Sequence, residues 1–345
     1  SQIKGRYVEA GERARLLAHY HERYLVDAAD VVDDGRLGLF NMSCEPGERL
    51  VTAEVLTQGE RFELVDPDGS AVPYDVIGVR EVDPGLIDRQ IVAAGNYEPF
   101  LCTTIQLRRD VPAVGYEVLS VREVDGARPQ APAARVGATA FETEAWGVSV
   151  RADGTIDLLD KAAGARLERV FAVECEGNDG DEYDFSPLRD GARLLSCDVV
   201  SCEPEVTERE HSVLVSMSYF LDLPETLEGW LDPASCGTRT LDVRLDLEFD
   251  RVSPVIGVRL TLDNQASDFR ARLLVPAGIA SSVSWSDNQF GRIERPVVDP
   301  ALGVWEEERW SERPDPIYPF LSYVALSDEA RTVAEAVELR LAHPE

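Results

Sequence analysis

The sequence predicts a mainly β protein, with two blocks of strands behind one helix. Short runs in which apolar and polar residues alternate recur from residue 37 to residue 275, which is the pattern of half-buried strands. Asp, Pro and Gly residues that form turns separate these runs. Gly126–Gly137 is rich in proline, alanine and glycine, and such a stretch marks a boundary between a smaller and a larger block.

The chain is strongly acidic, with 64 Asp and Glu against 34 Lys and Arg and a formal net charge of −30. Nucleic acids and anionic membranes both attract basic surfaces, so neither is an expected partner. No run approaches the roughly 18 apolar residues of a membrane span, and the first residues lack the core of a signal peptide. The six cysteines have no CxxC spacing, which favours reduced thiols in a cytoplasmic protein.

Residues 1–35 are predicted to form the helix. Apolar or small residues recur three and four apart between Tyr7 and Val31, so one stripe of the helix must pack on a neighbour. His19 and His21 stand two apart and point to different sides. This spacing favours a packing role for His21 over a shared metal site.

The first β block, residues 36–127, predicts a small antiparallel β-sandwich without catalytic residues. Asp66-Pro67-Asp68-Gly69 has the residues of a tight turn, since proline presets one φ and glycine permits a positive one. Short alternating runs surround this turn. The strands are expected at residues 37–43, 50–56, 61–65, 74–82, 100–107 and 116–121.

The second β block, residues 128–345, predicts broad sheets stacked face to face, with little helix. Ala152-Asp153-Gly154 is a hairpin signal between two runs. Later runs alternate for about ten residues, which is typical of strands with one buried side. The strands are expected at residues 141–150, 155–159, 194–203, 212–221, 241–249, 255–262 and 271–275.

One acidic stretch, residues 176–187 (EGNDGDEYDFSP), attracts attention because six carboxylates fall between Glu174 and Asp184. Unpaired carboxylates are costly to desolvate, so we expect an exposed loop. Three interpretations stay open: a solvated turn, a Ca²⁺ loop, or a loop that carries Tyr183 and a carboxylate into a sugar site. The carboxylates do not follow the alternating ligand positions of an EF-hand.

Three later segments place polar groups where loops are expected. Trp285, Asp287 and Arg295 lie in the second of them, and an apolar face with converging hydrogen-bonding groups is what a sugar pocket needs. The alternative is a surface loop with paired charges. The segments are residues 263–272, 284–296 and 315–320.

These motifs together resemble the C-terminal half of glycoside hydrolase family 38 α-mannosidases. GNDGDEYDFSP is similar to the family's Gly-Asp-x-Tyr-x-x-(Ser)-Pro signature, and SDNQFGRIERP to its Asp-x-x-Phe-Gly-x-x-x-Arg-Pro loop. GRLGLFNMS, WGVSVRADGTIDLLDKAAG, LTLDNQASDFRARLLVP and IYPFLSYVALSD resemble other segments of the family, in the same order.

The resemblance implies a galactose-mutarotase-like β-supersandwich for residues 128–345, and the last helix of a helical middle domain for residues 1–35. It also implies a retaining α-mannosidase whose zinc ion and aspartate nucleophile lie in an N-terminal domain. This chain has four histidines and no His-x-Asp pair near a strand, and Phe269 stands where the family usually has histidine. We therefore expect a C-terminal piece of a longer enzyme, inactive alone, with neither catalytic residues nor cofactor of its own.

By the same resemblance, Tyr183 and Arg295 would lie at the rim of the active site and bind substrate, while Asp181 and Asp287 would orient their loops. The expected partners are an α-mannoside and the missing catalytic domain; a homo-oligomer remains open. Two alternative functions are a non-catalytic carbohydrate-binding β module and a mutarotase-like epimerase. The epimerase would need a histidine and a glutamate facing one sugar ring, for which His211 and Glu308 are the candidates.

Overall fold

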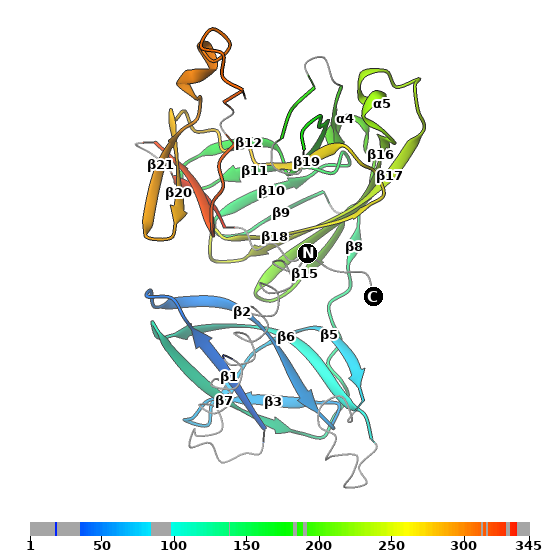
Figure 1. Cartoon of the computed structure of the whole chain (residues 1–345). Helices are drawn as coiled ribbons and strands as arrows, with labels where there is room; N and C mark the ends of the chain where they lie inside the picture. The colour runs from blue at the N-terminus through cyan, green and yellow to red at the C-terminus, as the bar shows by residue number, and fades with distance from the viewer. Residues whose placement is uncertain are drawn as a thin grey trace. The chain divides into compact units, whose positions relative to one another are not determined.

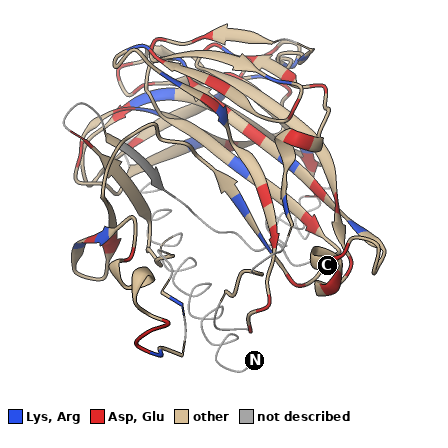
Figure 2. Cartoon of the chain, turned by 90° about the horizontal axis from the view of Figure 1, so that it is seen from above, with Lys and Arg blue, Asp and Glu red and all other residues tan. Residues whose placement is uncertain are grey.

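The computed structural model describes residue 18 and residues 35–83, 98–137, 139–181, 185–188, 192–311, 313–314, 317–328 and 332–336. The fold is mainly β, as predicted, and its sheets are antiparallel (Figure 1). The predicted helix at residues 1–35 lies outside the described residues, apart from residue 18 and Gly35. Acidic residues are spread over many strands and loops (Figure 2). None of the described helices is long and apolar enough to cross a membrane.

The chain divides into two compact units, and the first consists of residues 1–135, 206–215 and 247–257. One of its sheets has the order β1-β7-β3-β4 and another the order β2-β6-β5. Their strands are β1 (Gly35–Asn41), β2 (Gly47–Thr57), β3 (Phe62–Val65), β4 (Ala71–Val72), β5 (Asp75–Val82), β6 (Phe100–Val111) and β7 (Gly115–Glu123).

Apolar side chains from both sheets form one core, which confirms a β-sandwich. Leu64 and Leu119 come from one sheet, and Ile105 and Leu107 from the other. The predicted turn joins β3 to β4: Gly69 has a φ of 89° and its N–H donates to the Asp66 carbonyl at 2.9 Å.

Polar side chains tie the later segments 206–215 and 247–257 to this first unit. The buried Gln106 donates to Glu248 at 2.8 Å and accepts from the Ser212 hydroxyl at 2.6 Å. The Asp75 carboxylate accepts the backbone N–H groups of Glu210 and His211, each at 3.1 Å. A buried polar group without a partner is costly. These hydrogen bonds therefore stabilise the packing of segments 206–215 and 247–257 on the first unit, although both are distant from it in sequence.

The second unit consists of residues 136–205, 216–246 and 258–345. Its sheets have the orders β12-β11-β10-β9, β14-β13-β19 and β21-β20-β22-β23, and it holds most of the sheet β18-β17-β16-β15-β8. The strands are β8 (Arg135–Val136), β9 (Ala140–Glu142), β10 (Trp146–Val150), β11 (Ile156–Asp160), β12 (Ala165–Val170), β13 (Ala172–Gly177), β14 (Arg193–Leu195), β15 (Glu205–Glu208), β16 (Ser212–Pro224), β17 (Thr238–Asp250), β18 (Ile256–Asn264), β19 (Phe269–Leu274), β20 (Val283–Asn288), β21 (Gly291–Pro296), β22 (Tyr323–Ser327) and β23 (Thr332–Ala336).

A core in this unit joins β13 to the long strands β16 and β17. Val173 and Cys175 pack with Leu221, Trp230 and Leu241, and every one of these side chains is buried. Among the described residues of this unit, helix is confined to α4 (Ser196–Val199), α5 (Leu227–Leu231) and the 3₁₀ turn η1 (Pro300–Gly303). Stacked sheets with little helix agree with the fold class that the sequence predicts.

The structure corrects four of the predicted segments. Residues 141–150 form two strands, because a turn at 143–145 separates β9 from β10. Residues 194–203 hold the one-turn helix α4 after a short strand. Residues 284–296 form the hairpin β20–β21 rather than a loop. No residue of strand β18, which lies at the edge of its sheet, is fully buried.

Candidate functional site

The acidic stretch begins inside strand β13 rather than in a loop. All six residues of Ala172–Gly177 are buried, and Glu174 and Glu176 are 4% and 7% exposed. The prediction of an exposed loop is therefore wrong for Glu176 and Gly177. Buried carboxylates are tolerated where cations pair with them, and that is the case here.

Arginines on both neighbouring strands neutralise these two carboxylates. Glu176 lies opposite Arg270 of β19 and Arg193 of β14, and Glu174 lies opposite Arg272. Arg270 donates to Glu176 at 2.5 Å, while Arg272 binds Glu174 and also reaches Glu176 at 3.1 Å. Arg193 lies 3.5 Å from Glu174 and 3.7 Å from Glu176. We call these five side chains the arginine–glutamate ladder.

The loop after β13 is fixed at its base by hydrogen bonds and one ring contact. The Asn178 side-chain oxygen accepts the backbone N–H of Gly180 at 3.0 Å and that of Ser186 at 2.9 Å. The Arg270 guanidinium lies 3.4 Å from the centre of the Phe185 ring, within the range of a cation–π interaction. The ladder therefore also anchors this loop.

Of the residues that the sequence nominates in this loop, Asp181 is exposed. Tyr183 lies outside the described residues, so its role stays a prediction. Phe269, which replaces the histidine usual in the resembling family, stacks on Trp230 with ring centres 6.4 Å apart.

The β20–β21 hairpin presents its side chains on two faces. In its register Ser284 lies opposite Arg295, and Asp287 lies opposite Arg292. Because side chains alternate along a strand, Ser284, Ser286 and Arg295 share one face, and Trp285, Asp287 and Arg292 share the other. Sequence reasoning brings Asp287 and Arg295 to the same hairpin, but they point to opposite sides of it.

Arg295 is a cation without a carboxylate partner among the described residues. Its guanidinium carbon lies 4.7 Å from the centre of the Tyr318 ring. Its Nε is buried and has no hydrogen-bond acceptor among the described residues. In a protein with a net charge of −30, an arginine left unpaired in this way is available to a ligand that accepts hydrogen bonds.

Asp287 holds the segment that leads into β22. Its carboxylate accepts the backbone N–H groups of Leu321, Ser322 and Tyr323 at 3.0–3.2 Å, and the Ser322 hydroxyl at 2.5 Å. The Ser322 hydroxyl, followed by the backbone donors, holds the pKa of Asp287 well below its usual range. Hydrogen bonds to the charged form have this effect.

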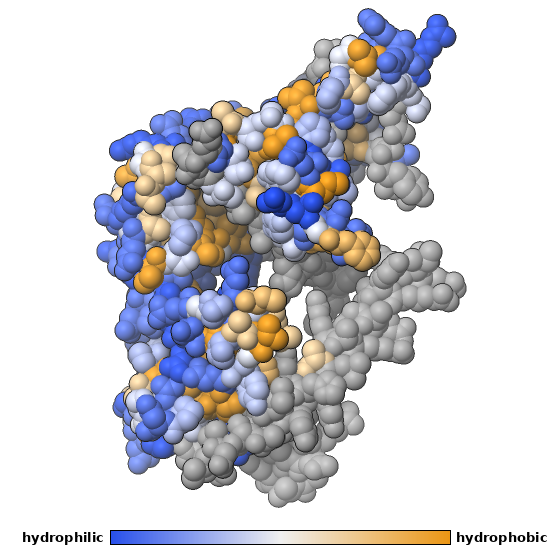
Figure 3. Space-filling view, turned by 90° about the vertical axis from the view of Figure 1, so that its left-hand side faces the viewer, coloured by the Kyte–Doolittle hydropathy of each residue, from blue (hydrophilic) through white to orange (hydrophobic). Residues whose placement is uncertain are grey.

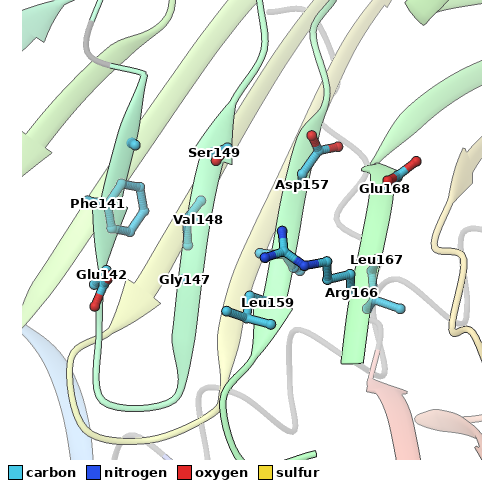
Figure 4. Close-up of a pocket in the computed structure, with 12 residues that line it drawn as sticks. Phe141, Glu142, Gly147, Val148, Ser149, Asp157, Leu159, Arg166, Leu167 and Glu168 are labelled. Carbon is cyan, nitrogen blue, oxygen red and sulfur yellow. The ribbon is translucent and has the colours of Figure 1, made fainter. Parts of the chain in front are cut away.

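A hollow of about 430 Å³ lies on the sheet β9–β12 (Figure 4). Figure 4 shows the Arg166 side chain extending from β12 toward β11, beside Leu159. The side chains of Arg166 and Glu168 form no hydrogen bond or ion pair with another described residue. None of the predicted site residues lines the hollow, and the sequence offered no signal for it beyond the hairpin that builds β10 and β11.

We assign no metal or epimerase site to the described residues, since His211 and Glu308, the epimerase candidates, belong to different units. No three His, Cys, Asp or Glu side chains are grouped as metal ligands there, so these residues do not fit a zinc ion and we assign no step to one. The His211 Nε2 atom is buried. Glu308 accepts the indole N–H of Trp310 at 2.9 Å.

Two residues in this region were missed by sequence reasoning. Tyr318 supports Arg295, and Phe185 packs on Arg270. Both lie in segments that the sequence singles out, 315–320 and 176–187. A contact between an aromatic ring and an arginine on another segment of the chain, however, leaves no local sequence pattern.

The fold consists of stacked antiparallel β-sheets with little helix. It is similar to an α-mannosidase from Enterococcus faecalis V583, with a TM-score of 0.71 and 17% sequence identity over 95% of this chain and 40% of that chain. A second solved structure, a protein in glycosyl hydrolase family 38 from Enterococcus faecalis, gives a TM-score of 0.69 and 17% identity over 94% of this chain and 41% of that chain.

In sequence, the chain is 25% identical over 260 residues to a Halalkalibacterium halodurans protein named "Putative mannosylglycerate hydrolase". The match covers 68% of this chain and 28% of that protein. No family model matches. These comparisons confirm the resemblance to glycoside hydrolase family 38, and the chain spans less than half the length of the proteins it matches.

Proposed function

We propose that the chain is the C-terminal β region of a longer glycoside hydrolase of family 38, which cleaves α-mannosidic bonds with retention. One observation carries the proposal: the likeness to an α-mannosidase extends over 95% of this chain and only 40% of that enzyme. The nucleophile, the acid/base carboxylate and the zinc ion then belong to the part of the enzyme outside this chain. Retention requires two carboxylates about 5–5.5 Å apart, and we assign neither to the residues described here.

In this proposal the chain contributes to the rim of the active site through Arg295 and Tyr183. The unpaired guanidinium of Arg295 suits a substrate hydroxyl or an anionic aglycone. The name of the Halalkalibacterium relative, with its glycerate group, favours the anionic aglycone. Asp181 and Asp287 orient the two loops, and the four hydrogen-bonded groups around Asp287 support that role.

An exposed apolar end of the β20–β21 hairpin favours a further domain as the partner. Phe290, at the tip, is fully exposed, and Ile317 and Leu321 are 50% and 59% exposed. The Asp287 carboxylate binds Leu321, so this segment lies at the same end as the tip. Figure 3 shows one face of the molecule as largely hydrophilic, with separate hydrophobic patches. We propose that the catalytic domain covers the hairpin end.

We also propose that the protein is cytoplasmic. Its six cysteines form no disulfide, as expected in a reducing compartment. The arrangement into homo-oligomers stays an open prediction.

The test is the hydrolysis of an aryl α-mannoside by this chain and by a polypeptide that restores the region upstream of residue 1. We expect turnover only with the longer polypeptide. Turnover with both would refute the assignment of catalysis to the other domain. Turnover with neither would refute the proposed activity.

A non-catalytic carbohydrate-binding module is the second candidate, and the hollow on β9–β12 favours it. Its volume of about 430 Å³ is within the range of ligand sites, and Arg166 and Glu168 offer unpaired polar groups. This candidate predicts that the isolated chain binds methyl α-mannoside in titration calorimetry, and that Arg166→Ala abolishes the binding. An absence of heat with the wild-type chain would exclude it.

A further inference from the structure

The face of the β20–β21 hairpin that carries Arg295 is unusual because its polar groups lack partners. Ser286 is 4% exposed and its hydroxyl has no hydrogen-bond partner among the described residues, and the same holds for the Arg295 Nε. The two residues lie on one face, since Ser284 is opposite Arg295 and Ser286 follows on the same side of β20. Buried groups of this kind call for an explanation.

The contact between Tyr318 and Arg295 explains why the Arg295 guanidinium has no carboxylate partner. A carboxylate would hold a guanidinium in place but would also neutralise it. An aromatic ring holds the guanidinium through its electron-rich face and leaves the net charge uncompensated. At 4.7 Å from the ring centre, Arg295 is held in this second way.

Asp287 holds the segment that follows Tyr318. Tyr318 lies three residues before Leu321, the first of the backbone donors bound by the Asp287 carboxylate. Since Asp287 is on β20 and Arg295 is on β21, the segment bound on one face of the hairpin returns its tyrosine to the other face. Asp287 therefore binds the segment, the segment carries Tyr318, and Tyr318 contacts Arg295 on the same hairpin as Asp287.

We propose that Tyr318 is a positioning residue: its ring fixes the Arg295 guanidinium while leaving its charge free for the substrate, and Asp287 fixes the segment that carries Tyr318. This inference rests on the proposed function for the statement that Arg295 binds substrate. The positioning itself concerns only residues of this chain.

The same hairpin provides a matched comparison. On the opposite face, the Arg292 guanidinium lies 4.1 Å from the centre of the Trp285 ring. That pair has the same chemistry, an arginine over an aromatic ring, but does not involve Tyr318. Trp285→Leu is therefore the control for Tyr318→Leu.

The first experiment measures hydrogen exchange of the arginine Nε–H groups in this chain by ¹⁵N NMR. Tyr318→Leu should accelerate exchange at Arg295 by about two- to fivefold, the factor expected for an exposed or partly exposed cation–π contact. Tyr318→Phe should leave it unchanged, because the ring remains. Trp285→Leu should accelerate exchange at Arg292 and leave Arg295 unchanged. Unchanged exchange at Arg295 in Tyr318→Leu would overturn the inference.

The second experiment uses the longer polypeptide and an α-mannoside with an anionic aglycone. Tyr318→Leu should raise KM by about two- to fivefold with little change in kcat, as a loss of uniform binding does, and Tyr318→Phe should restore the wild-type KM. Equal KM values for Tyr318→Leu and wild type would overturn the inference. If Arg295 loosens in the NMR experiment but the longer polypeptide hydrolyses no α-mannoside, the positioning role holds and the proposed function falls.

Discussion

Removal of Arg270 should destabilise the second unit far more than removal of an exposed ion pair. We choose Arg270→Met, which keeps most of the aliphatic stem and removes the guanidinium from Glu176 and from the Phe185 ring. The Arg270 and Glu176 side chains are only 21% and 10% exposed, so the carboxylate would stay away from water.

The expected magnitude follows from what remains around Glu176. Breaking a buried pair by removing one partner costs about 3–5 kcal/mol. Arg272 at 3.1 Å and Arg193 at 3.7 Å still compensate part of the charge, so we expect a loss of about 2–3 kcal/mol. The control is Glu142→Gln, which removes a pair with Lys161 whose side chains are 77% and 33% exposed; such a pair contributes about 0–1 kcal/mol.

Tryptophan fluorescence during urea unfolding measures the effect on the second unit alone. All five tryptophans of the chain lie in residues 136–205, 216–246 and 258–345, so the first unit is silent. The free energy of unfolding should fall for Arg270→Met and stay within about 1 kcal/mol of wild type for Glu142→Gln. Equal losses for the two variants would refute the reasoning, because they would mean that solvent screens the ladder as it screens a surface pair.

Three further predictions concern Asp287, the cysteines and a glycine. Asp287→Asn should increase hydrogen exchange at the Leu321–Tyr323 amides. In the wild type, the pKa of Asp287 is lowered in the folded state. Its stabilising effect is therefore complete above the ordinary pKa of an aspartate and is lost as the pH falls toward the lowered pKa. Amide exchange that responds neither to the substitution nor to this fall in pH would contradict the role of Asp287. Burial and the neighbouring Glu174 raise the pKa of Cys175 to about 12, whereas the Thr226 backbone lowers that of Cys236. Iodoacetamide at pH 8 should label Cys236 before Cys175, as followed by mass spectrometry, and equal rates would be inconsistent with these environments. Gly154→Ala should cost about 1 kcal/mol or more, because Gly154 has a φ of 77° and an added Cβ would lie 3.0 Å from the Tyr219 ring. The control is Gly69→Ala, which introduces backbone strain alone, because Gly69 has a φ of 89° and no atom lies within 4 Å of the added Cβ. An equal loss of stability in the two variants would show that the contact with the Tyr219 ring contributes nothing.

The sequence predicted well what depends on local patterns. Alternation identified the long strands β16 and β17. In β17, the odd-numbered residues from Leu241 to Phe249 are buried. Turn chemistry identified the loops at Gly69 and Gly154, both with positive φ.

Long-range pairing was beyond the reach of these patterns. Glu176 was expected to be exposed because its compensating arginines lie on β19 and β14, and nothing near it in sequence indicates them. For the same reason β18 was expected to have a buried side: alternation shows that a strand has an apolar face, but not that the strand lies at the edge of its sheet. The pairing of Tyr318 with Arg295 depends on a segment that returns to the hairpin, and so it too was not predictable.

The ladder on β13 also constrains how the chain folds as it is made. Glu176 and Arg270 are 94 residues apart, and Glu174 and Arg272 are 98 apart. At about 5–20 residues per second of synthesis, roughly 5–20 s separate the appearance of the carboxylates from that of their main partners. Until β19 emerges, Arg193 of β14 is the one member of the ladder that can compensate the two carboxylates, so we expect the core around Trp230 to close late. A chain interrupted before residue 269 would therefore expose a charged strand and an open sheet edge, which a quality-control protease or chaperone recognises.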